Sequence, residues 1–257
     1  MPILEPNPII PNIDYYHETD AREVRALQEL SIADNEEYFM TSLFKVPTIL
    51  ICTDFDYGRL NEAEMKNYGV VVSRSVGGNH ALWMGTNVIS ARFYLNNGTA
   101  KMMHDLVYDA LNTLGVGCTI EDKPVKEKAI GGKEIFLNGK IVGGFTGEEQ
   151  YGTNVFIGNI ISIIVDYSEA EKCCSNWNYD IRRTAGINQL GYALTAQEII
   201  DELKNKVPKH FKRTLRNKVK DTQRIAEIRD LKVDRKEWIN YGREYEPNNY
   251  TGRESDL

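Results

Sequence analysis

The sequence lacks long hydrophobic runs and paired cysteines, and each absence narrows the class of protein. No stretch of about 18 apolar residues occurs in the 257 residues, so we expect no membrane span. The start of the chain, Met1-Pro2-Ile3-Leu4-Glu5-Pro6, has neither the basic region nor the apolar core of a secretory signal. The four cysteines show no CxxC spacing, which argues against a zinc site. A reduced cytoplasmic protein is the simplest expectation.

Several motifs of common enzyme classes are also missing. The sequence contains no GxGxxG or GxxxxGK[ST], the glycine-rich turns that cradle nucleotide phosphates. It contains no HExxH and no GxSxG, and its four histidines are scattered singly. These absences exclude the usual dinucleotide-binding, P-loop, zincin and serine-hydrolase signatures.

Composition and charge describe an ordinary globular chain with an uneven charge distribution. The hydrophobic fraction is 42% and the charged fraction 26%, enough for one large domain or one domain with a small appendage. Residues 204–236 carry a net charge of +9, and the rest of the chain carries −15. Such a basic tract is either a solvated helix face or a docking surface for an anionic partner.

Hydrophobic periodicity predicts helices alternating with strands. Helical spacing follows Asp20, with an extension over 35–43, and recurs after Asn61, Thr99 and Thr195; the basic stretch 209–232 is expected to be helical. Strands are expected at 46–52, 70–72, 88–95, 115–120, 133–137, 140–145 and 154–167. Asn138-Gly139 between two of them indicates a tight hairpin.

This pattern predicts an α+β fold, a mixed β-sheet with packed helices. Four of the eight prolines lie in the first 13 residues, which we interpret as part of an extended arm. The expected organisation is therefore an N-terminal arm over 1–18, a main domain over 19–205 and a basic helical extension over 206–257.

Two stretches suit anion binding. In the first, the apolar strand 70–72 runs into Arg74 and the pair Gly77-Gly78. An arginine at a strand end can meet a phosphate or carboxylate with a two-pronged donor, and glycines allow close backbone approach. In the second, Lys140 follows the expected hairpin turn directly. Each feature alone is as readily explained by an ordinary surface turn, but the two together are more specific.

These stretches resemble the signatures of the biotin/lipoate protein ligase family. Residues 69–78 (GVVVSRSVGG), with Asn87 downstream, are similar to the lipoate–protein ligase pattern G-(V/I)-x-V-x-R-R-x-S-G-G-G-A-V-x-H-D-x-G-N. Residues 133–144 (KEIFLNGKIVGG) are similar to N-D-I-x-x-x-G-x-K-(I/V)-x-G-(S/G)-A. Residues 181–190 and 236–242 resemble two later stretches of these enzymes, so the likeness covers roughly residues 20–245.

The resemblance implies the catalytic-domain fold of that family and a two-step ligase. ATP and lipoate, or octanoate, would form an acyl-AMP, and the acyl group would then pass to a lysine of a lipoyl-acceptor carrier protein. Lys140 would be the catalytic residue at the acyl-adenylate, Arg74 would hold its carboxylate or phosphate, and Gly77 and Gly78 would let the backbone approach. Glu134 would hold Mg²⁺. The remaining acyl-adenylate contacts would be Ser75, Asn79, His80, Asn87, Lys133 and Gly143.

The resemblance also bears on partners. The basic tract 204–236 would suit an acidic carrier domain. The accessory domain of the family is nearly all missing, so a separate small subunit is a possible partner. Neither nucleic acid nor a membrane is expected. The lipoyl tail would lie in an apolar channel, with Val72, Trp83 and Val142 as candidate lining.

Several positions depart from the family pattern and leave alternatives open. Ser73 replaces the first motif arginine, Trp83-Met84 replace a His-Asp pair, and Lys133-Glu134 replace an Asn-Asp pair. One alternative is an ATP-independent octanoyl transferase that works through a cysteine, for which Cys118, Cys173 and Cys174 are the candidates. The other is a catalytically altered pseudo-ligase that binds a lipoyl domain or a nucleotide.

Overall fold

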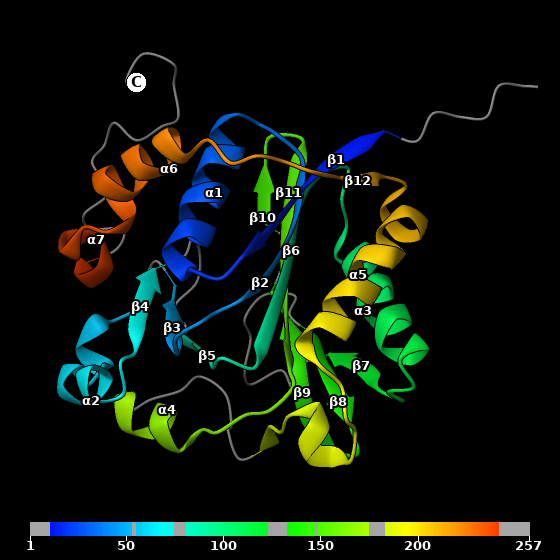
Figure 1. The fold of residues 1–257 in the computed structure, drawn as a ribbon. Coiled ribbons are helices and arrows are strands. Elements are labelled where there is room, and N and C mark those ends of the chain that lie inside the picture. Colours follow the sequence, from blue (N-terminus) through cyan, green and yellow to red (C-terminus); the bar gives the residue numbers. More distant parts are fainter. Residues whose placement is uncertain are drawn as a thin grey trace, which may run out of the picture.

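The computed structural model describes residues 11–52, 55–74, 81–122, 133–146, 149–174 and 183–241, which form two sheets with helices packed around them (Figure 1). The strands of the larger sheet are β1 (Asn12–Glu18), β2 (Tyr38–Leu43), β6 (Val88–Asn96), β7 (Thr119–Asp122), β8 (Lys133–Leu137), β9 (Lys140–Phe145), β10 (Glu149–Tyr151), β11 (Asn154–Ser162) and β12 (Thr214–Asn217). They stand in the order β12-β1-β2-β6-β11-β9-β8-β7, and β10 pairs with β11.

The smaller sheet consists of β3 (Thr48–Ile51), β4 (Val71–Arg74) and β5 (Ala81–Met84), in the order β4-β3-β5. Both sheets are mixed: β1 runs parallel to β2 and β12, and β3 runs parallel to β4, while the other pairs are antiparallel. The predicted α+β fold with a mixed sheet is therefore confirmed.

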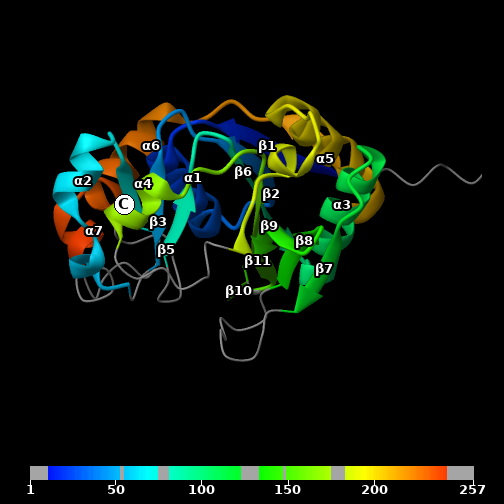
Figure 2. The ribbon, with the colours of Figure 1, turned by 90° about the horizontal axis from the view of Figure 1, so that it is seen from below.

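The helices cover the larger sheet from both sides. The helices are α1 (Ala21–Ala33), α2 (Glu62–Asn67), α3 (Ala100–Thr113), α4 (Ser168–Cys173), α5 (Ala196–Phe211), α6 (Thr222–Ile228) and α7 (Lys236–Tyr241). Helices α3 and α5 lie side by side on one face and close the main core, whereas α1 and α6 pack on the other face (Figure 1). Figure 2 shows the smaller sheet with α2, α4 and α7 at one end of the molecule.

Helix ends follow the local sequence closely. The side chain of Asp20 accepts hydrogen bonds from the backbone N–H groups of Arg22 and Glu23, at 2.7 and 3.1 Å. Thr195 and Glu198 form the reciprocal capping box at the start of α5. The predicted hairpin turn is confirmed as well, since Asn138 and Gly139 have φ angles of 51° and 76°, as a type I′ turn requires.

Three expectations about elements are wrong. Residues 38–43 do not extend the first helix but form β2, because Asn35 ends the helical run with a φ of 52° and β-forming residues follow. Residues 12–18, expected in an extended arm, form β1 inside the sheet. The stretch 209–232 is not one helix, because Lys212 takes a φ of 52° after α5 and residues 214–217 then pair with β1.

The described residues include no helix that is long and apolar enough to cross a membrane.

Candidate active site

The face of the larger sheet that α1 and α6 cover, here called the polar face, carries polar and glycine residues among apolar ones. Alternation sets this face: Ile89, Ala91 and Phe93 of β6 point into the core under α3 and α5, so Ser90 and Arg92 point to the opposite side. Strand pairing continues both rows across the sheet. The first row is Ser42, Ser90, Ile160, Gly144 and Glu134, and the second is Met40, Arg92 and Gly158.

The β8–β9 hairpin carries the proposed catalytic lysine, which pairs with Leu137 of β8. Lys140 is the first residue of β9, directly after the tight turn, and its side chain is exposed. The carbonyl of the next residue, Ile141, accepts a hydrogen bond from the backbone N–H of Ala185 at 2.9 Å. The guanidinium of Arg183 lies 5.9 Å from the centre of the Phe136 ring. Two of the signature stretches, 133–144 and 181–190, therefore meet in space.

Gly143 has a packing reason for being glycine. A Cβ at this position would lie 2.3 Å from the carbonyl oxygen of Ile160 and 3.0 Å from Cδ1 of Ile135. Strand β9 is irregular here, and Gly143 faces the side of the main core. Its predicted contact with the acyl-adenylate stays a prediction. The glycine on the polar face is its neighbour Gly144, where a Cβ would meet only the carbonyl oxygen of Lys133, at 3.3 Å.

The two residues that replace the family's Asn-Asp pair lie on β8. Lys133 forms an ion pair with Asp122 across the β7–β8 pair, at 3.1 Å. Glu134 is 4% exposed and belongs to the polar row. Within the described part of the chain, no group of three or more His, Cys, Asp or Glu residues converges as a preformed metal site. Any divalent cation at Glu134 would need most of its ligands from a bound phosphate and water.

Arg74 links separate backbone segments through hydrogen bonds to their carbonyl groups. Its side chain is 1% exposed, and it donates hydrogen bonds to the carbonyls of Cys52 at 2.7 Å, Phe55 at 3.1 and 3.2 Å and Ile239 at 2.7 and 2.9 Å. Arg74 thus ties β4 to the end of β3 and to α7, and its role toward an adenylate stays a prediction.

Of the remaining predicted site residues, the described part of the chain includes Asn87. Asn87 lies in the turn between β5 and β6, and its carbonyl accepts a hydrogen bond from the N–H of Ile163 at 2.9 Å. Five other candidates lie outside the described residues: Ser75, Gly77, Gly78, Asn79 and His80. The structure therefore does not test the glycine pair.

The expected lining of an apolar channel is wrong as a set. Val142 is fully buried in the main core beneath α3 and α5. Val72 and Trp83 belong to a different cluster, between the smaller sheet and helices α2 and α4. These side chains do not line one channel, because they belong to two different sheets and to two separate buried clusters.

The cysteines do not provide an activated thiolate among the described residues. All four are buried, and burial raises the pKa of the Cys118 and Cys173 thiols. A nucleophilic cysteine needs a lowered pKa, from a neighbouring cation or a helix N-terminus. This environment disfavours the octanoyl transferase alternative.

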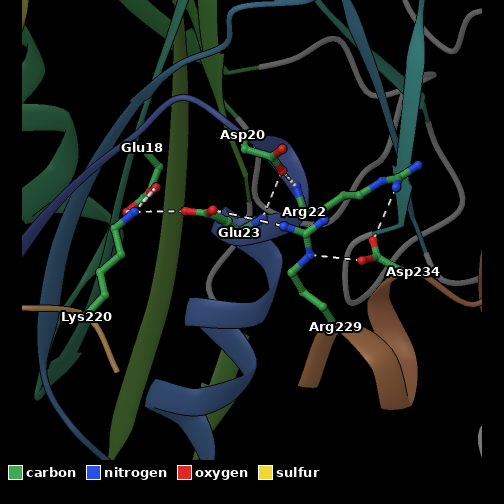
Figure 3. Close-up of polar contacts among 7 residues, drawn as sticks. All are labelled: Glu18, Asp20, Arg22, Glu23, Lys220, Arg229 and Asp234. Carbon is green, nitrogen blue, oxygen red and sulfur yellow. Dashed lines mark hydrogen bonds and ion pairs between the residues drawn. The ribbon is translucent and has the colours of Figure 1, made fainter. Parts of the chain in front are cut away.

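The basic tract finds its acidic partners inside the chain. Lys220 lies 2.7 Å from Glu18 and 2.8 Å from Glu23, and Arg229 lies 2.9 Å from Asp234 (Figure 3). The cations at 213, 216, 218, 224 and 232 pair with carboxylates at 37, 14, 36, 34 and 29 respectively. The tract is therefore a strap whose cations pair largely with carboxylates of the same chain, and the docking surface for an acidic carrier stays a prediction.

Sequence reasoning missed Arg92 and Tyr38. Both point to the polar face, and Arg92 stands in the middle of an otherwise apolar strand, Val88-Ile89-Ser90-Ala91-Arg92-Phe93-Tyr94-Leu95. A single charged residue within an apolar strand is the sequence feature that could have identified Arg92.

Comparison with known proteins identifies the architecture. No protein-family model and no curated protein matches the sequence. Solved structures do match it. Lipoate-protein ligase A bound with ATP is 11% identical, with 90% of this chain and 98% of that chain covered and a TM-score of 0.76. The chain has the fold of the lipoate–protein ligases.

Two further structures with the lipoate–protein ligase fold match over a similar range. Protein Ta0514 of T. acidophilum with bound lipoic acid is 12% identical, covers 90% of this chain and 99% of its own, and gives a TM-score of 0.74. The bi-partite lipoate protein ligase of Thermoplasma acidophilum, studied with its E2 lipoyl domain, is 12% identical, covers 90% and 97%, and gives a TM-score of 0.72. At these identities the likeness establishes the fold.

Proposed function

We propose that the chain is a cytoplasmic ATP-dependent lipoate–protein ligase, which activates lipoate or octanoate as an acyl-AMP and transfers the acyl group to a lysine of a carrier domain. The observation that carries this proposal is the match to lipoate-protein ligase A over 90% of this chain and 98% of that one, joined to the position of Lys140 on the β8–β9 hairpin.

Lys140 acts at the acyl-adenylate in this proposal. Its side chain is exposed at the start of β9, and its ammonium group would contact the carbonyl and phosphate oxygens of a bound acyl-AMP. A positive charge placed there stabilises the negative charge that grows on these oxygens during acyl transfer. The hydrogen bond between Ile141 and Ala185 fixes the hairpin against the segment before α5.

Glu134 would hold Mg²⁺ together with the nucleotide phosphates, and the ion would supply charge neutralisation on those phosphates. The chain's own contribution there is one carboxylate at the edge of the polar row. We further propose Asn87, Lys133, Gly143 and Arg74, with Ser75, Gly77, Gly78, Asn79 and His80, as the acyl-adenylate contacts.

The partner in the second step is proposed to be a lipoyl-acceptor protein. The Thermoplasma acidophilum relative is described as bi-partite and was studied with an E2 lipoyl domain. By analogy, a separate small subunit is a second proposed partner, and the transfer assay compares the chain with and without it.

A pseudo-ligase remains the second candidate, and the state of Arg74 favours it. The guanidinium is engaged by backbone carbonyls, and the Asn-Asp pair of the family is replaced by Lys133 and Glu134. Such a protein would bind lipoate, ATP or a lipoyl domain without forming an adenylate.

The deciding experiment is adenylation in the absence of an acceptor. The protein is incubated with ATP, MgCl₂ and lipoate, or octanoate, and pyrophosphate and acyl-AMP are measured. Formation of both supports the ligase, and subsequent transfer to a lipoyl domain completes the assignment. Binding of lipoate or ATP without pyrophosphate release would instead support the pseudo-ligase. Acyl transfer from an acyl carrier without ATP would overturn the ligase proposal.

A further inference from the structure

Arg92 is a partly buried arginine whose guanidinium has no hydrogen-bond or ion-pair partner among the described residues. It lies in the middle of β6, with Met40 of β2 on one side and Gly158 of β11 on the other. Its side chain leaves the sheet on the polar face, away from the main core. Within the described part of the chain, we find neither a hydrogen-bond acceptor nor a carboxylate paired with its guanidinium.

Two acids of α1 and β10 contact other residues. Glu29 of α1 pairs with Arg25 and lies 3.1 Å from Lys232. Glu149 of β10 accepts a hydrogen bond from the Tyr151 hydroxyl at 3.1 Å. An arginine without a partner in a low-dielectric setting is costly, so such a residue is normally paired or serves a ligand.

Tyr38 supplies a second polar group without a partner on the same face. It stands two residues from Met40 on β2, diagonal to Arg92, and its ring stacks on Tyr94 with centroids 6.0 Å apart. The residue is 0% exposed, yet its hydroxyl has no hydrogen-bond partner among the described residues. Buried hydroxyl groups nearly always form a hydrogen bond. The Tyr38 hydroxyl is therefore also a candidate to bind a ligand atom.

The pKa shifts of Arg92 and Tyr38 are consistent with the two side chains lying close together. Burial raises the pKa of the Tyr38 hydroxyl, and the charge of Arg92 opposes that shift, as expected for close neighbours. Burial also lowers the pKa of Arg92 to about 10, so its guanidinium stays charged at neutral pH. Both groups are therefore hydrogen-bond donors under physiological conditions.

Gly158 is the neighbour of Arg92 on β11. A Cβ at this position would make only ordinary contacts, 3.6 Å to Cγ of Arg92 and 3.6 Å to Thr146, so its absence is not forced by packing. The N–H of Gly158 is already donated to the Thr146 hydroxyl at 2.8 Å. Arg92 and the Tyr38 hydroxyl are the donors that we assign to a ligand.

We propose that Arg92 and the Tyr38 hydroxyl form an anion-binding subsite on the polar face of the sheet, which holds an oxyanion of the ligand. A planar guanidinium beside a hydroxyl donor suits a carboxylate or phosphate oxygen. The ligand class is thus an organic acid or a phosphate ester. This goes beyond the proposed ligase reaction, because the subsite binds the anion whether or not an adenylate is formed.

The test compares ligands that differ only in charge. Binding of octanoate, uncharged octanamide and ATP to the full-length protein is measured by calorimetry without acyl transfer. Charge-assisted hydrogen bonds predict that Arg92→Met weakens one of the two anions by about tenfold or more and leaves octanamide unchanged. If Arg92→Met binds octanoate more weakly, the subsite binds a carboxylate. If it binds ATP more weakly, the subsite binds a phosphate. Arg216→Met, at the far edge of the sheet, is the control and should bind as the wild type does.

Two milder variants keep the proposal testable if Arg92→Met fails to fold. Arg92→Lys retains the charge and should recover part of the affinity. Tyr38→Phe removes only the hydroxyl; it should leave the urea midpoint unchanged or raised, because no protein partner is lost, while anion affinity falls several-fold. The proposal is overturned if neither anion binds to the wild type, or if Arg92→Lys and Tyr38→Phe bind both anions within twofold of the wild type.

Discussion

The ammonium group of Lys220 lies 2.7 Å from the carboxylate of Glu18, across 202 residues of sequence. Glu18 is 2% exposed and ends β1, and Lys220 follows β12. The contact fastens the basic strap to the first strand of the sheet, next to a second acid, Glu23 (Figure 3).

We predict that Lys220→Met lowers the free energy of unfolding by about 1–3 kcal/mol, because it leaves a buried carboxylate without its cation. Urea denaturation at neutral pH measures the loss. Burial already raises the pKa of Glu18, and Lys220 opposes that shift. Protonation of Glu18 removes the buried charge, so the loss should begin to shrink while the pH is still above the ordinary carboxyl range, as the pH falls through the raised pKa of Glu18. Lys101→Met, in an exposed pair with Asp105, is the control; an equal loss there would contradict the prediction.

Gly143→Ala should be strongly destabilising. The new Cβ would lie 2.3 Å from the Ile160 carbonyl oxygen, so β9 and β11 must separate, at a cost of about 2–3 kcal/mol or more. Gly144→Ala in the same strand is the matched control, because its nearest atom lies at 3.3 Å. Urea midpoints of the two variants give the comparison, and similar losses would show that the strand adjusts freely.

Lys140→Ala should abolish acyl transfer and leave folding intact. The side chain is exposed at the end of a hairpin, so the free energy of unfolding should change by less than about 0.5 kcal/mol. Acyl transfer to a lipoyl domain and a urea curve are measured on the same preparation. Lys101→Ala, on the outer surface of α3, is the control. Full activity in Lys140→Ala would place the reaction elsewhere.

Arg74→Met should release the C-terminal helix. Five hydrogen bonds to the carbonyls of Cys52, Phe55 and Ile239 are lost, and several of these carbonyls are left without a donor, which predicts a loss of about 3 kcal/mol or more. Limited proteolysis should then cut near α7 sooner than in the wild type. If the variant keeps its stability and protease resistance but loses adenylation, Arg74 serves the ligand instead.

Asp109 predicts a pH dependence of stability. Hydrogen bonds from Lys209 and His210 lower the pKa of its carboxyl from 3.8 to about 2. A lowered pKa stabilises the folded state above the ordinary value, and this contribution is lost as the pH falls toward 2. The melting temperature of Asp109→Asn should therefore lie below that of the wild type at pH 7, with the difference closing between about pH 4 and pH 2. A constant difference over this range would contradict the assignment.

Local features of the chain were predictable because they depend on nearby residues. The caps at Asp20 and Thr195 and the Asn138-Gly139 turn follow from side chains within three residues of the backbone groups that they satisfy. The structure of 35–43 was not predictable in this way, since its apolar run suits either a helix or a strand. Residues 38–43 form a strand because they pair with β1 and β6.

The sequence by itself determined the alternation of helices and strands, the mixed α+β class, the hairpin that carries Lys140 and the likeness to the lipoate–protein ligases. Those properties arise from short-range patterns. Only the tertiary structure decided the roles of charged residues, because a charge takes its role from its spatial neighbours. It turned the +9 tract into an internal strap, engaged Arg74 with backbone carbonyls, and placed Arg92, in the middle of an apolar strand, on the sheet face that α1 and α6 cover.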